Sequence, residues 1–246
     1  MMIVTTRKHS YLIFDEDYSM IEVGSTLFNP EENKMYMLLE PGVLTEIAAE
    51  VLTVESLEEL IEAIAAGGEI TINGTIDAPA AFEITTDTII TNNGELTISE
   101  DTVGDGVFKA TAGTLILNGQ GTINGLGKNA YSMAVWATDN GKVIINDGYF
   151  TNIGASSDFD SEHFDLIYAS GNGQIEINGG EFECETPNWI LNIKDKDRAT
   201  ASIIVKGGKF HGFNPADCAV EGEHTNFVAP GYKVIEENGV FTVIAE

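Results

Sequence analysis

Short segments along most of the chain alternate apolar and polar residues, so that every second side chain is hydrophobic. Most of them open with glycine and end at an asparagine corner; they span residues 68–74, 94–99, 113–119, 141–147, 173–179 and 201–207. A period of two residues is typical of a β-strand that buries one face. Because a lone strand cannot bury that face, the recurrence predicts equivalent strands stacked on one another.

A second apolar strand precedes most of these segments, at residues 107–110, 134–137, 166–169 and 189–192. After the corner comes an aromatic residue at a fixed offset, namely Phe150, Phe182 and Phe210. We expect these rings to stack inside the protein, and the corner asparagines to hydrogen-bond from coil to coil. The recurring order favours a parallel β-solenoid of roughly six coils over a β-sandwich, whose strands would not repeat it near one period.

Both ends of such a stack must be covered, because open strand edges pair with other chains. Residues 56–59 (Ser-Leu-Glu-Glu) form a capping box, which predicts a helix over 57–66 that Gly67 ends. Its apolar face is expected at Leu57, Leu60, Ile61 and Ile64. At the other end, Asn238-Gly239 between two apolar strands predicts a hairpin that caps the last coil.

The first 52 residues do not follow the repeat. Segments 10–14 and 19–23 flank an acidic turn and favour a hairpin, and segment 34–39 favours a third strand. We therefore expect a β protein in four parts: a small N-terminal attachment module (1–52), a capping helix (53–68), a parallel β-helix (69–213) and a C-terminal cap with a hairpin (214–246).

The charge balance narrows the choice of partners. The chain has 39 acidic and 12 basic residues, a formal net charge of -27. Such a surface repels phosphate backbones and anionic lipids, so we expect neither nucleic acid nor a membrane as partner. The start of the chain has no secretory signal pattern, which predicts synthesis in a reducing cytoplasm, with Cys184 and Cys218 as free thiols.

Two stretches resemble known families. Residues 54–112, which begin VESLEELIEAIAAGGEITINGTIDA, resemble the opening of pectate-lyase-like right-handed β-helices. Residues 207–244, which begin GGKFHGFNPADCAVEGEHTNFVAPGY, are similar to the C-terminal segment of small β-helix proteins in bacteriophage virions, of the head-fibre, decoration and tail-spike type. The resemblance implies a right-handed coil and a homotrimer; strand spacing alone implies neither.

One acidic loop could carry chemistry. Residues 156–165 supply Asp158, Asp160 and Glu162, and glycoside hydrolysis needs two carboxylates across a sugar. The same spacing resembles the start of a calcium loop, but glycine at its sixth position and the distal glutamate are missing. Because acidic residues are abundant throughout, we interpret the loop as a solvated turn and expect no catalytic residue, metal or cofactor. If the protein is an enzyme, these three carboxylates are the candidates.

Assembly has a clearer sequence signal. The residues between the inward positions should point outward, namely Thr71, Thr97, Ile116, Ile144, Glu176 and Ile204. Three isoleucines in an outward row are unexpected on so acidic a monomer. They predict an interface with neighbouring copies in a trimer, unless the protein's own loops cover them.

Our leading expectation is a structural, non-enzymatic virion protein of a bacteriophage. It would be a trimeric head fibre or capsid decoration, made in the host cytoplasm and attached to capsid or other virion proteins through residues 1–52. The alternative is a polysaccharide depolymerase, a glycoside hydrolase or lyase acting on host surface glycan. A bacterial surface adhesin is a third possibility. Host surface carbohydrate is a candidate partner in either of the first two cases.

Overall fold

A computed structural model gives the architecture. It describes residues 2–5, 10–13, 26–29, 34–40, 43–47, 52–98, 105–126, 133–155 and 164–246. The chain divides into two compact units, Met1–Val51 and Leu52–Glu246. Each unit is described by itself below.

The N-terminal unit is one antiparallel sheet with the strand order β2-β1-β3-β4-β5. Its strands are β1 (Met2–Thr5), β2 (Ser10–Ile13), β3 (Thr26–Asn29), β4 (Lys34–Glu40) and β5 (Val43–Ile47). The strand expected near residue 34 is confirmed. Strand β2, the first half of the predicted hairpin, lies at the edge of the sheet and pairs with β1, so its pairing with segment 19–23 stays a prediction. Segment 19–23 lies outside the described residues. The short apolar run of β1 carries no turn signal beside it, and this explains why the pattern did not mark it.

The second unit is mostly β, and its strands are distributed in rotation to three sheets that are parallel throughout the stack. The first sheet holds β6 (Leu52–Val54), β7 (Gly68–Ile72), β10 (Thr88–Asn92), β13 (Thr114–Asn118), β16 (Lys142–Ile145), β19 (Gln174–Ile177) and β22 (Ser202–Val205). The second holds β8 (Thr75–Ala78), β11 (Glu95–Ile98), β14 (Thr122–Asn124), β17 (Tyr149–Thr151), β20 (Glu181–Glu183) and β23 (Gly208–His211). The third holds β9 (Phe82–Ile84), β12 (Phe108–Ala110), β15 (Val135–Ala137), β18 (Ile167–Ala169) and β21 (Leu191–Ile193).

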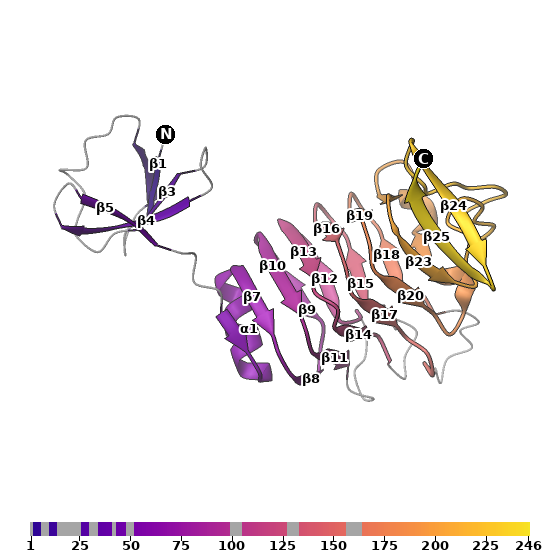
Figure 1. Cartoon of the computed structure of the whole chain (residues 1–246), viewed down its shortest axis with the longest axis horizontal. Coiled ribbons are helices and arrows are strands. Elements are labelled where there is room, and N and C mark those ends of the chain that lie inside the picture. The colour runs from indigo at the N-terminus through magenta and orange to yellow at the C-terminus, as the bar shows by residue number, and fades with distance from the viewer. Residues whose placement is uncertain are drawn as a thin grey trace. The chain divides into compact units, whose positions relative to one another are not determined.

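This rotation winds the chain into stacked coils, as in a β-solenoid, and Figure 1 shows strands of successive coils side by side. The inward positions stay in register from coil to coil and are buried. In the first sheet they are Ile70, Ile90, Leu117, Ile145, Ile177 and Val205. Repetition of one apolar position per coil therefore produces a continuous core.

The predicted aromatic ladder is confirmed. Phe150, Phe182 and Phe210 are fully buried, and their ring centroids are 5.0 and 4.8 Å apart in stacked geometry. These distances match the spacing of neighbouring strands, which is roughly 4.8 Å. The ladder fixes the register of the second sheet, because a slip of one residue would turn every ring to solvent.

The asparagine ladder is confirmed as well. The Nδ2 of Asn146 donates to the Oδ1 of Asn118 at 2.9 Å, and the Nδ2 of Asn178 donates to the Oδ1 of Asn146 at 3.0 Å. These side chains stand at the corner between the first and second sheets. They link three successive coils at a position exposed to solvent.

One of the predicted repeats is not equivalent to the others, because its strand lies in a different sheet. Residues 94–99 match the glycine-first pattern, but their strand, β11, belongs to the second sheet. The first sheet uses β10 in that coil, where Thr88 is buried at an inward position. Because no glycine precedes β10 and its first inward residue is polar, the pattern did not identify it.

The helix α1 (Leu57–Ala66) covers the N-terminal end, as expected. Its capping box is formed: Ser56 Oγ accepts from the Glu59 amide at 3.3 Å, and Glu59 Oε2 accepts from the Ser56 amide at 3.2 Å. The expected apolar face is wrong at one position, since Ile61 is 50% exposed. The buried face consists of Leu60, Ala63 and Ile64.

The C-terminal segment closes all three sheets. The predicted hairpin is formed by β24 (Tyr232–Glu237) and β25 (Val240–Ala245), and β25 pairs antiparallel with β23 on the second sheet. On the first sheet, the Val205 amide donates to the Phe227 carbonyl at 2.9 Å. On the third sheet, the Ile193 amide donates to a Glu221 carboxylate oxygen at 2.7 Å. The last strand of each sheet therefore has a partner other than a further coil, which protects it from pairing with other chains.

Candidate functional site

The outward face of the first sheet carries an apolar row. Strand register aligns six outward residues in it, namely Glu69, Ile89, Ile116, Ile144, Glu176 and Ile204. Ile204 is 43% exposed, and Ile116 and Ile144 are half-buried. The structure therefore places all three isoleucines of the predicted interface on one outer face, stacked along the coils.

Two members of the predicted row lie elsewhere. Thr97 is on the second sheet, because its strand, β11, belongs to that sheet. Thr71 is on the first sheet but pairs with Thr91, one outward position away from the isoleucines. The row contains instead Ile89, which sequence reasoning missed. The adjacent pair Ile89-Ile90 in the sequence could have indicated it, because one of two neighbouring strand residues must point outward.

Charged residues of both signs lie around this row. The outward charged residues of its strands are Glu69, Lys142 and Glu176, and Glu55, Asp87 and Lys206 stand directly beside strand ends of the same sheet. Lys206 Nζ lies 2.7 Å from Glu176 Oε2, and this bond lowers the pKa of the Glu176 carboxyl. This ion pair compensates the carboxylate that stands between Ile144 and Ile204 in the row.

The predicted catalytic carboxylates cannot be placed in the same way. Asp158, Asp160 and Glu162 lie outside the described residues. Asp165, just after them, is half-buried, and its Oδ1 accepts from the Nδ2 of Asn192 at 2.8 Å. This bond holds the end of the loop against the last strand of the third sheet.

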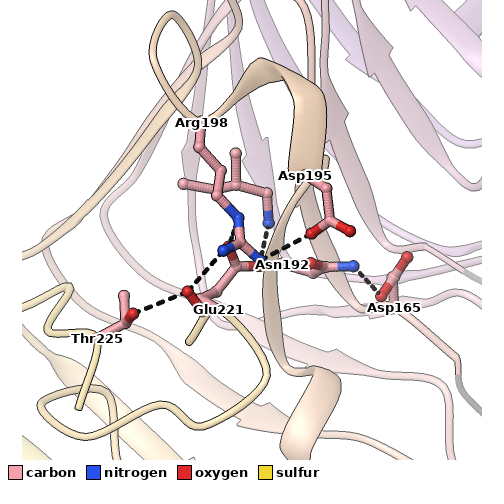
Figure 2. Close-up of polar contacts among 7 residues, drawn as sticks. Asp165, Asn192, Asp195, Arg198, Glu221 and Thr225 are labelled. Atoms are coloured by element: carbon pink, nitrogen blue, oxygen red, sulfur yellow. Dashed lines mark hydrogen bonds and ion pairs between the residues drawn. The ribbon is translucent and has the colours of Figure 1, made fainter. Parts of the chain in front are cut away.

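A buried carboxylate lies beside that point. Glu221 is 5% exposed; one oxygen accepts from the Ile193 amide at 2.7 Å, and the other lies 3.1 Å from the Nε of Arg198. Figure 2 shows Arg198 between Glu221 and Asp195, with Asn192 turned toward Asp165. The cluster joins the third sheet to the C-terminal segment.

The chemistry of this cluster is structural. Burial raises the pKa of Glu221, while the Ile193 amide and Arg198 favour its charged form. A raised pKa is also a property of catalytic acids. Here, however, both carboxylate oxygens are already bonded to the protein and the side chain is closed to solvent. The carboxylate replaces the strand that would follow in a longer stack.

An aromatic pair on the outer face of the third sheet also links neighbouring coils. Trp136 and Tyr168 are neighbours in register, with ring centroids 5.9 Å apart. The ammonium of Lys109 lies 4.6 Å from the centroid of the Trp136 ring. Neighbouring coils thus contact this ring on both sides, which leaves little of its face for a ligand.

The remaining candidate groups carry no reactive geometry. Cys184 and Cys218 are free and buried; burial raises the pKa of Cys184 to about 11 and also raises that of Cys218. A neutral buried thiol is a poor nucleophile. Within the described ranges, no group of three or more His, Cys, Asp or Glu side chains could hold a metal ion. In the same part of the chain, no helix is long and apolar enough to cross a membrane.

Comparison with protein-family models, with curated proteins and with solved structures finds no match. The site arguments therefore rest on geometry, and the phage context rests on the sequence resemblance described above.

Proposed function

We propose that the protein is a structural, non-enzymatic component of a bacteriophage virion. Its second unit would form a right-handed parallel β-helix that trimerises through the outward row of the first sheet. The N-terminal unit would attach the trimer to the capsid or to another virion protein, as a head fibre or capsid decoration. The observation that carries the proposal is the register of Ile89, Ile116, Ile144 and Ile204 on one outer face.

Burial of this row would provide the driving force. Full burial of an isoleucine side chain stabilises by roughly 1.5–3 kcal/mol, and half-buried residues contribute a fraction of that. Each copy in a three-fold bundle would bury its row against a neighbour, so the contribution repeats around the axis. Copies of net charge -27 repel one another. The ion pair of Glu176 with Lys206 reduces that repulsion at the contact, and salt at about 0.15 M screens charges more than ~8 Å apart.

The division of the chain supports separate roles for its parts. The N-terminal unit is compact by itself and has its own antiparallel sheet. The second unit has an apolar core along its whole length and closed ends, which suits a stiff spacer. The proposed place in a phage particle comes from residues 207–244, which resemble the C-terminal segment of virion β-helix proteins, and the right-handed coil comes from residues 54–112, which resemble pectate-lyase-like β-helices.

The experiment is a mass measurement in solution. Light scattering or sedimentation of the full chain at micromolar concentration should give a trimer. The double substitution Ile116→Asp and Ile144→Asp should give a monomer, because it places two carboxylates in the apolar row. The control, Thr97→Asp with Thr122→Asp, adds two carboxylates to the second sheet instead and should remain a trimer.

Three outcomes would overturn the proposal. They are a monomeric unaltered protein, a trimeric isoleucine double variant, and release of reducing ends from host surface glycan. If that release is lost in Asp158→Asn or Asp160→Asn, the protein is a depolymerase instead.

A further inference from the structure

An open groove of about 480 Å³ runs along the outer side of the second sheet. It crosses the coils that contain β17, β20 and β23 and reaches the C-terminal strand β25. Its side chains come from several coils; they are Gln120, Asp147, Tyr149, Glu181, Lys209 and Thr242. Ligand sites in proteins enclose roughly 300–1,000 Å³, so the groove has room for a ligand.

Glycines at the corner of each coil hold the groove open. Gly180 and Gly208 have φ of +97° and +104°, a region that side chains other than glycine rarely adopt. A Cβ on Gly180 would lie 3.1 Å from the carbonyl oxygen of Gly148, and one on Gly208 would lie 3.2 Å from that of Gly180. At these corners successive coils therefore expose bare backbone, and the larger side chains of the groove stand beside it.

The groups beside this backbone are held in place by their neighbours. The Tyr149 hydroxyl donates to Glu183 Oε2 at 2.6 Å across one coil. Glu181 Oε1 lies 2.6 Å from the Nε2 of His211. Lys209 lines the groove and is exposed, and among the described residues its ammonium forms no ion pair, so it can donate to a ligand. A fixed ring next to fixed acceptors and a free donor is preorganised for a ligand.

The lining chemistry identifies the class of ligand. A phenol ring, carboxylates, an amide, a hydroxyl and an ammonium group provide one apolar surface and several donors and acceptors. A sugar ring has the matching arrangement, with hydroxyl groups at its edge and C–H groups on its faces. The carboxylates at Asp147, Glu181 and Glu183 outnumber the single ammonium at Lys209, so anionic sugars and nucleotides would be repelled.

We propose that this groove binds an uncharged oligosaccharide, laid along the stack of coils. An extended chain fits because the groove crosses consecutive coils, and each coil adds roughly 4.8 Å of length. Tyr149, Glu181 and Lys209 occupy three successive positions of one outward row, one in each coil. The sugar would contact the ring at one end and donate or accept hydrogen bonds along the row. The site goes beyond the proposed virion role and does not depend on trimerisation.

The experiment uses the full chain on a glycan array. The probes are uncharged hexose and N-acetylhexosamine oligosaccharides, compared with sialylated, sulfated and uronic-acid glycans. Uncharged probes should bind, and calorimetry on the best probe should show an affinity at least tenfold lower for Tyr149→Ala and for Lys209→Ala. Tyr149→Phe keeps the ring and should lose less. The control, Lys142→Ala, removes an outward lysine from the first sheet and should bind unchanged.

Three results would overturn the inference. They are absence of binding to every uncharged probe at millimolar concentration, preference for anionic probes, and unchanged affinity in both Tyr149→Ala and Lys209→Ala. Lys209 is exposed, so its variant keeps the fold, which thermal unfolding would verify. If the protein is monomeric and still binds sugar, the trimer proposal is wrong and the inference about the groove stands.

Discussion

The outer faces of the first and second sheets are built on the same coils and have opposite character. On the first sheet the aligned outward positions are mostly isoleucine, and Glu176 in the same row is paired with Lys206. On the second sheet the outward charged residues are Asp77, Glu95, Glu181, Glu183 and Lys209, with His211. The first face is suited to contact with another protein surface, and the second to polar ligands and solvent.

The difference shows how a stacked fold separates its roles. Most inward positions are apolar, because they fill a close-packed core, so they determine the architecture and leave little freedom for substitution. Each coil adds one to three outward residues to each face, in register with those of the neighbouring coils. A row such as Ile116–Ile144 or Tyr149–Glu181 can therefore be extended or changed on one face without affecting the other.

The largest expected effect comes from the interior that both faces share. Phe182→Ala would leave a cavity between the rings of Phe150 and Phe210, which stack on either side of it. Such truncations cost roughly 3–5 kcal/mol. Urea unfolding should show this loss, and self-association and sugar binding should weaken together.

Phe182→Leu is the matched control for this effect. It keeps most of the apolar volume and should cost a smaller part of that free energy. The opposite outcome is that Phe182→Ala leaves the free energy of unfolding unchanged and abolishes only self-association or only sugar binding. The two faces would then not depend on one shared interior.

Much of the architecture was readable from the sequence, because it depends on repeated local chemistry. The capping box at Ser56 and the stacked phenylalanines lie where the pattern predicted. The pattern failed where a strand broke the local rule: β10 lacks a leading glycine and buries Thr88. The groove was not predictable, since its residues are brought together only by the three-dimensional register of different coils.

A smaller effect is expected at Glu221, which belongs to neither face. Glu221→Ala would leave the buried Ile193 amide without an acceptor, and an unpaired buried donor costs about 1–3 kcal/mol. Glu221→Gln keeps an oxygen for that amide and should cost less. Urea unfolding of both variants measures the loss in the free energy of unfolding. Equal losses for Ala and Gln would mean that the ion pair with Arg198, not the amide bond, holds the end of the stack.

The same residue gives a pH dependence with a defined sign. Burial raises the pKa of Glu221 above its ordinary value of 4.5, so the folded chain holds this proton more tightly than the unfolded chain. Its contribution to stability is fully present below pH 4.5 and is lost as the pH rises through the folded-state pKa. Relative to Glu221→Gln, the unaltered protein should therefore gain stability between pH 7 and pH 5. A relative loss would show that Arg198 outweighs burial.

The smallest effect is expected at the corner where the two faces meet. Asn146 makes one hydrogen bond as donor to Asn118 and one as acceptor from Asn178. A hydrogen bond contributes about 0.5–1.5 kcal/mol net, and exposed ones fall at the lower end. Asn146→Ala should therefore reduce the free energy of unfolding by about 1 kcal/mol. Asn146→Asp, which loses only the donor, should lose about half as much as Asn146→Ala by the same measure. Because these bonds run from coil to coil rather than from face to face, neither variant should change self-association or sugar binding; a change in either would mean that the corner couples the two faces.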